Sequence, residues 1–450
     1  MMTRLLTVAP TPIDFAVSAG AEVRDPAGYA RFWKRVERES DISGIRFDHA
    51  VELRESPRYG SLRADALQRT LHVLSGEFTP DELPFEVPNN LTSLWGCVRK
   101  IRFWLYDHSV VVVELDGQVS DWLGDAATDS GERLDDLQAE AISLSGLVVS
   151  AVAALKLQPV LNVARRLDPT SAFVDWQAEE WADVSPRWVS RSLVLDFDDP
   201  DSERIARHWL ADIGDETAVD ELVAGGSAHV SRWLNYVHRG YRAGVATALL
   251  PDASEAWRAM RYAQYFYAAL DLVDDRLNGV LAETTEGLKA WEQTDLTERL
   301  RRLSHRAELV MLDLQDLRKY VTRRVRAEMD RILDVWSYAD LVEEPVRFKI
   351  TICDRRLEEL AAGRQARAGT VTDVILLGIG VTSVLGTALA VTDFGRSVAT
   401  DPDQAGYGSA SSGLTEWFAS QPADAILVGS VVVSALLVVL FLAVRRSGSS

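Results

Sequence analysis

Cysteine is scarce in this sequence. The chain has two, Cys97 and Cys353, in 450 residues, and neither stands near a second cysteine or a histidine at metal-ligand spacing. A disulfide framework needs several cysteines, and a structural zinc site needs closely spaced thiolate or imidazole ligands. The sequence therefore predicts two free thiols in a reducing compartment.

Basic residues are fewer than acidic ones, and the common catalytic motifs are absent. The chain has 67 acidic and 48 basic side chains, a net charge of −19, so its surface would repel a phosphate backbone and we expect no nucleic-acid partner. It contains no G-x-x-x-x-G-K-[ST], G-x-S-x-G or H-E-x-x-H, and its seven histidines are scattered, which predicts isolated histidines. We expect neither enzymatic activity nor a cofactor.

Two apolar runs near the C-terminus are the strongest signal that is present. Val374 to Val391 gives about 18 uncharged residues and Ala425 to Val444 about 20, which as helices would reach roughly 27 and 30 Å, the thickness of the hydrocarbon layer. We predict a transmembrane hairpin over 371–446, with residues 392–424 as the loop. The apolar segment from Leu144 to Leu157 is too short for a span and is expected to be a buried helix.

The charges that flank the two runs predict their orientation. Cytoplasmic flanks collect lysine and arginine. The arginines beside the runs are Arg355, Arg356, Arg364 and Arg367 before the first and Arg445 and Arg446 after the second. The loop holds one arginine and five acids, among them Asp393, Asp401 and Asp403. We therefore predict a two-span protein of the inner or plasma membrane with both termini in the cytoplasm.

Small residues recur every four positions in the first run. They are Gly378, Thr382, Gly386 and Ala390, and Ser430 and Ser434 repeat the spacing in the second run. Such a face lets another helix approach closely. It indicates either a homo-oligomeric interface or pore lining, or the packing of the two spans within one hairpin.

A heptad-like pattern precedes the spans and predicts a helical stalk over 286–370. Its apolar seam includes Leu296, Leu300, Leu303, Leu314, Leu317 and Val321. The seam fits packing against the rest of the cytoplasmic part, or an oligomeric stalk. Pro345 should break or kink this helix.

The N-terminal part predicts two α+β lobes, residues 1–165 and 166–285. Strands are expected at about Val98 to Tyr106 and Val110 to Leu115, and a second pair on either side of Arg239 and Gly240. Each pair is preceded by a strand and a helix and followed by a helix, which suggests a duplicated β-α-β-β-α unit. The fold class is then an α+β cytoplasmic region, a helical stalk and a transmembrane hairpin.

Two groups of acids are candidate metal ligands. One is the run "DFDDPDSE", with Asp196, Asp198, Asp199, Asp201 and Glu203; the other comprises Asp271, Asp274 and Asp275. The first lacks the glycine and terminal glutamate of a calcium loop, so helix capping by Asp201 or Ser202 is expected there. The second is expected to be a solvated helix face.

The layout of an acidic cytoplasmic part, a long helix, two spans and a basic tail resembles the CorA-like divalent cation channels, over about the last 160 residues. The family's Gly-Met-Asn motif is absent: Thr392, Asp393, Phe394 and Gly395 take its place. The resemblance implies a pore of first spans, with Asp393, Asp401 and Asp403 concentrating cations at its outer mouth.

Two functions follow from these patterns. The first is a membrane-anchored sensor, effector or scaffold that oligomerises through its stalk and hairpin, with the bilayer, a second copy, and a protein or small ligand as partners. The alternative is a CorA-like divalent cation channel.

Overall fold

The computed structural model has two compact units, unit 1 over Met1–Asp354 and unit 2 over Arg355–Ser450. The structure describes residues 3–18, 25–47, 72–123, 130–176, 184–197, 199–211, 220, 229–230, 234–239, 251–283, 290–400, 417, 420–422, 424–425, 428–436 and 438.

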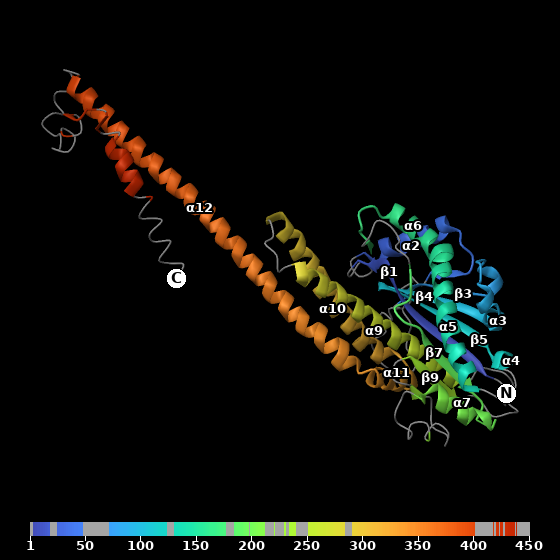
Figure 1. Ribbon diagram of the computed structural model, residues 1–450. Coiled ribbons are helices and arrows are strands. Elements are labelled where there is room, and N and C mark those ends of the chain that lie inside the picture. The colour runs from blue at the N-terminus through green and yellow to red at the C-terminus, as the bar shows by residue number, and fades with distance from the viewer. Residues whose placement is uncertain are drawn as a thin grey trace, which may run out of the picture. The chain divides into compact units, whose positions relative to one another are not determined.

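A single nine-stranded sheet forms the centre of unit 1 (Figure 1). Its strands are β1 (Arg4–Val17), β2 (Ile45–Phe47), β3 (His72–Phe78), β4 (Val98–Tyr106), β5 (His108–Gln118), β6 (Val174–Asp175), β7 (Ser190–Leu195), β8 (His229–Val230) and β9 (Asn235–Arg239). Their order is β2-β3-β4-β5-β1-β7-β9-β8, with β6 paired to β1. The expected strands at β4 and β5 are confirmed, and the sheet and its helices make the chain a mixed α/β protein.

The sheet differs from the two separate lobes expected from the sequence. Strand β1 lies between β5 and β7, so both of its edges are paired and strands from both sides of residue 165 share one sheet. Strand β1 runs antiparallel to β5, whereas β7 runs parallel to β9. The strand expected after Gly240 lies outside the described residues.

One face of the sheet, the α5 face, is covered by helices from the part of unit 1 that precedes β9. These are α2 (Pro26–Ser40), α3 (Thr92–Cys97), α5 (Ser130–Val152), the π-helical η3 (Ala153–Leu157), α6 (Gln158–Leu167) and α7 (Asp201–Trp209). Short elements η1 (Pro80–Glu82), η2 (Asn89–Leu91) and α4 (Ser120–Leu123) connect the strands to them. Alternate residues of β5, namely Val111, Val113 and Leu115, join this core.

The apolar segment from Leu144 to Leu157 is buried in that core, as expected from its length. Leu144, Val148 and Leu157 are 1% exposed or less. Within the described residues, the helical run Gly131–Leu167 is the one helix long and apolar enough to cross a membrane, but 56% of its most apolar window is buried inside the protein. That burial is typical of a core helix.

The opposite face, the α9 face, carries α9 (Pro251–Glu283), α10 (Ala290–Tyr320) and α11 (Arg323–Val335). Helix α9 packs on β1 and β5, and α10 and α11 pack on α9 (Figure 1). Leu296, Leu300 and Leu314 of the predicted seam are at most 2% exposed, and Leu303, Leu317 and Val321 are partly buried. The apolar seam thus packs against other helices of the same chain, which is the intramolecular packing that was one of its two interpretations.

The expected irregularity at Pro345 takes the form of a π-helical segment, η5 (Ala339–Glu343), that leads directly into α12 (Glu344–Thr400). Proline has no N–H to donate to the preceding turn, so it is tolerated in the first turn of α12. Helix α12 is 57 residues long, and the division between the two units falls inside it.

In unit 2, α12 continues through the first apolar run to Thr400. The loop that the sequence placed from residue 392 therefore begins later than expected, because Thr392 to Thr400 remain helical. Residues 428–436 of the second run are helical. A complete hairpin is not described, since residues 401–416 and 439–450 lie outside the described part of the chain.

Candidate metal centre

The turn between β4 and β5 presents two chemically active side chains side by side. Asp107 links the two strands and His108 opens β5. Ser109 has a φ of 64°, in the left-handed region, which gives the turn its sharp bend. The Asp107 carbonyl accepts a 3.1 Å hydrogen bond from the Val17 amide, so the turn is also fixed to β1.

A third side chain, Asp313 of α10, reaches this turn. His108 Nε2 lies 2.9 Å from Asp313 Oδ2 and 3.8 Å from Asp107 Oδ1. One nitrogen or oxygen from each of the three residues lies within 4.8 Å of the others. Asp107, His108 and Asp313 are 3%, 6% and 9% exposed. We call these three residues the Asp-His-Asp cluster.

Neighbouring groups orient the cluster. The Tyr265 hydroxyl of α9 donates to Asp107 Oδ1 at 3.2 Å. The Tyr265 ring stacks on Tyr106, with ring centres 4.0 Å apart, and lies nearly parallel to the His108 ring. Arg306 Nη1 donates to Ser109 Oγ at 3.2 Å. Outer contacts of this kind hold metal ligands in position in known metal sites.

The donor set is suited to a divalent transition metal. Two carboxylates and one imidazole match the mixed nitrogen and oxygen ligands of Mn²⁺, Fe²⁺ or Zn²⁺, whereas Ca²⁺ and Mg²⁺ prefer oxygen alone. Without a metal, the same geometry serves as a buried hydrogen bond between His108 and Asp313. The cluster joins strand β5 to α10, so an ion held there would fasten the outer helical layer to the sheet.

A layer of buried charge continues along the α9 face beside the cluster. Glu114 of β5 pairs with Arg261 of α9 at 3.2 Å, and the Arg261 guanidinium lies 3.6 Å from the centre of the Trp104 ring. Burial raises the pKa of Glu114, an effect that the charges of Arg261 and Arg102 oppose. Burial also raises the pKa of Tyr106 strongly, so that hydroxyl remains protonated.

The small-residue face of the first apolar run is open in the structure. Gly378, Thr382, Gly386 and Ala390 are exposed, and a Cβ added at Gly378 or Gly386 would meet no described atom within 4 Å. Ser430 and Ser434 are instead buried, each 8% exposed. The spacing shared by the two runs therefore does not bring their small residues together.

The predicted outer-mouth acids are described in part. Asp393 is exposed on α12, seven residues before its last residue, Thr400. Asp401 and Asp403 lie outside the described residues.

The two acidic groups weighed from the sequence have structural partners. Asp199 Oδ1 accepts the Asp201 amide at 3.0 Å at the start of α7, and the Ser202 hydroxyl donates to the Asp196 carbonyl at 2.6 Å. Asp199, rather than Asp201 or Ser202, therefore accepts an amide of the first turn. Asp198 lies outside the described residues. On α9, Asp271 and Asp275 pair with Arg187, and Asp274 pairs with Lys349 at 2.6 Å. The second group is thus an ion-pair network and not simply a solvated face.

Sequence reasoning missed the Asp-His-Asp cluster because it treated His108 as isolated. The adjacency of Asp107 and His108 in a predicted hairpin turn was the available signal. Asp313 lies 205 residues from His108 in the chain, on a helix whose packing partner the sequence left open.

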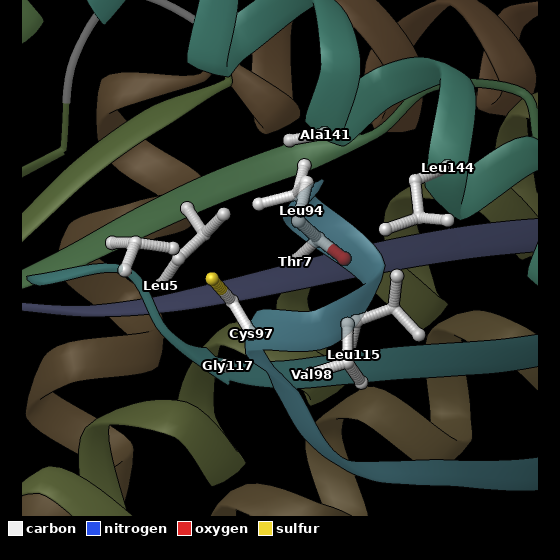
Figure 2. A pocket seen from close by; sticks show the side chains of 10 residues that line it. Leu5, Thr7, Leu94, Cys97, Val98, Leu115, Gly117, Ala141 and Leu144 are labelled. Atoms are coloured by element: carbon white, nitrogen blue, oxygen red, sulfur yellow. The ribbon is translucent and has the colours of Figure 1, made fainter. Parts of the chain in front are cut away.

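A cavity on the α5 face offers no comparable site. Figure 2 shows it between β1, β5 and helices α3 and α5, lined by apolar side chains with Thr7 and Cys97. It holds about 10 Å³, room for about one water, and the Cys97 thiol beside it donates to the Ser93 carbonyl at 3.5 Å.

Comparison of the chain with models of protein families, with curated proteins and with solved structures found no match.

Proposed function

We propose that the protein is a membrane-anchored sensor. In this proposal unit 1 binds a divalent transition metal at the Asp-His-Asp cluster, the apolar runs of unit 2 insert in a bilayer, and the small-residue face of α12 pairs with further copies. The cytoplasmic side would hold unit 1, as the flanking arginines indicate.

The observation that carries the proposal is the exposure of apolar side chains in unit 2. Ile375, Leu376, Ile379 and Leu389 of α12 are 53–60% exposed. Val428, Val431, Val432, Val433 and Leu436 are 48–61% exposed. The exposure of so many apolar side chains is costly in water and is typical of a segment that contacts lipid or another protein.

Membrane association can be tested in the full-length chain with a matched pair of variants. Asparagine at Ile375, Leu376, Ile379 and Leu389 should release the protein from the membrane fraction in alkaline carbonate, because polar residues at mid-membrane are unfavourable. The control carries asparagine at four exposed apolar residues of unit 1, listed by exposure as Phe348, Leu341, Leu312 and Ile142. The membrane anchor would be refuted if both variants were released equally from the membrane fraction, or if the unmodified protein were released.

The sensing half of the proposal depends on the position of the cluster. Asp313 belongs to α10, and α10, α11 and α12 follow one another in the chain. Metal binding would stabilise the arrangement in which α10 is docked on the sheet, because ligands brought together by folding couple metal affinity to that fold. A change in occupancy would then bias the helical layer from which α12 begins.

Metal binding can be measured by calorimetric titration of the full-length protein with Mn²⁺, Zn²⁺ and Mg²⁺. We expect one site that prefers Mn²⁺ or Zn²⁺ and that His108→Asn weakens at least about tenfold, since loss of a ligand or its support typically has effects of this size. His208→Asn is the control, because His208 forms a similar 3.0 Å pair with Asp135 at the surface. An unchanged metal affinity in His108→Asn would show that the Asp-His-Asp cluster is not the metal site.

A cation channel is the second candidate, favoured by the open small-residue face of α12. Gly378 and Gly386 have no described atom near their Cβ positions, so helices of other copies could approach there and surround a pore. Flux of Mg²⁺ or Mn²⁺ through the full-length protein in liposomes, lost on Gly386→Leu, would favour the channel. If correctly inserted protein gave no flux, the channel would be refuted and the membrane-anchored sensor would stand as the proposed function.

A further inference from the structure

Arg191 is a buried cation for which the described part of the chain supplies no counter-charge. It lies in β7 with 8% of its surface exposed, and its Nε has no hydrogen-bond partner. None of the carboxylates in the described part of the chain forms an ion pair with it, and burial alone accounts for the lowering of its pKa. A guanidinium nevertheless remains charged at neutral pH.

The pairing of the strands places Arg191 in a row of polar residues. It lies opposite Thr7 of β1 on one side and Asn235 of β9 on the other. Residues paired in this way project from the same face of a sheet. Thr7 contacts Ser145 of α5, and Asn235 contacts Gln138 of α5, so the row lies on the α5 face, in otherwise apolar surroundings.

The neighbours of Arg191 in this row carry no negative charge. Thr7 Oγ1 and Ser145 Oγ are 2.8 Å apart and satisfy each other. Asn235 Nδ2 donates to Gln138 Oε1 and to the Trp209 carbonyl, both at 2.9 Å. The row is thus polar but neutral around a single positive charge.

Other partly or fully buried arginines of unit 1 form ion pairs with carboxylates of the chain. Arg261 has Glu114 at 3.2 Å, and Arg187 has Asp275 at 2.6 Å. An unpaired buried charge is strongly unfavourable, and a guanidinium presents a planar fork that matches the oxygens of phosphate or carboxylate. An oxyanion from solution would supply the charge that the described residues do not.

We propose that Arg191 binds the phosphate or carboxylate group of a small anionic ligand at the α5 face. The small exposed fraction of Arg191 limits its contact with a ligand to little more than the anionic group itself. The remainder of any larger ligand would extend into solvent. This site lies on the opposite face of the sheet from the Asp-His-Asp cluster and does not depend on the proposed function.

The test is thermal unfolding of the full-length protein at constant ionic strength, with chloride replaced by inorganic phosphate, adenosine monophosphate or succinate. The phosphate arms distinguish a free anion from a nucleotide, and succinate represents carboxylates. At saturation we expect a rise in Tm of about 2 °C or more from at least one of them, since a ligand that binds only the folded state raises its stability. Arg191→Met should abolish the rise, and Arg191→Lys, which lacks the fork, should weaken the apparent affinity about tenfold or more.

Arg187→Met is the matched control, because Arg187 already has carboxylate partners; this variant should keep the full response to the anion. In the absence of added anion, Arg191→Met should be at least as stable as the unmodified protein, because it removes an unpaired charge. Three results would overturn the proposal: no response to any of the three anions, an equal response in Arg191→Met, or a large fall in Tm of that variant without anion. The last would mean that the protein itself already pairs Arg191.

Discussion

The buried pair of Glu114 and Arg261 offers a sharp prediction about the α9 face. Arg261→Met keeps much of the length of the side chain and removes its charge. It leaves Glu114, whose side chain is 2% exposed, with the Arg102 guanidinium at 3.9 Å as its remaining close cation. It also removes the stacking of the guanidinium on Trp104. The substitution should therefore destabilise the packing of α9 on the sheet.

The magnitude follows from two contributions. Breaking a buried ion pair by removal of one partner costs about 3–5 kcal/mol, and a desolvated cation–π contact contributes about 2 kcal/mol. Arg102 and the apolar packing of methionine offset part of this loss. We expect a net decrease of about 3 kcal/mol in the free energy of unfolding at pH 7.

A double-mutant cycle measured by urea unfolding tests this reasoning. Glu114→Gln alone leaves Arg261 unpaired, and the double variant removes both charges, so we expect it to be less destabilised than the sum of the single variants by about 1–3 kcal/mol. The penalty of Arg261→Met should also shrink at lower pH, because the raised pKa of Glu114 allows that carboxyl to take up a proton in the folded state. Additive effects, within about 0.5 kcal/mol, would refute the pairing as the source of stability.

Three further predictions concern stability. Burial raises the pKa of Glu328, which accepts a hydrogen bond from Tyr236; the folded state therefore binds its proton more tightly than the unfolded state. The unfolding free energy of the unmodified protein should thus fall relative to that of Glu328→Gln as pH rises from 4.5 through the raised pKa, and parallel urea-unfolding results at pH 4.5 and 7.5 would contradict this. Asp168 accepts hydrogen bonds from the amides of three residues, Ala172 to Val174, at 2.7–3.0 Å. Asp168→Ala should therefore lower the free energy of unfolding, measured in urea, by about 2–4 kcal/mol. A decrease below about 0.5 kcal/mol would show that water replaces the carboxylate. Leu144→Ala should enlarge the cavity of Figure 2 and cost about 2–5 kcal/mol by the same assay, whereas a smaller loss would indicate that α5 collapses onto the sheet.

Local sequence patterns predicted the individual elements well. The strand expected at Val110 to Leu115 falls within β5, and the helix expected after the second strand pair is found as α9. These signals are local, because side-chain periodicity depends on the geometry of one element. The burial of Leu144 to Leu157 was predictable for a similar reason, since its length is too short for a span.

Long-range arrangement was not predictable from the same patterns. Which edge of β1 accepts β7 depends on a pairing across more than 180 residues, and no local periodicity encodes it. The Asp-His-Asp cluster has the same origin, since Asp313 reaches His108 only when α9 packs on the sheet and α10 packs on α9. The burial of Arg191 was not predictable either, because it depends on the position of β7 inside the sheet, between β1 and β9.

The most direct test of the sensor is hydrogen–deuterium exchange of the full-length protein with and without Mn²⁺ or Zn²⁺. If the metal joins β5 to α10, exchange should slow at residues 107–109 and around Asp313 in the unmodified protein and in His208→Asn, and should not change in His108→Asn. Exchange that is unaffected by either metal at both elements, or slowed equally in His108→Asn, would contradict the account.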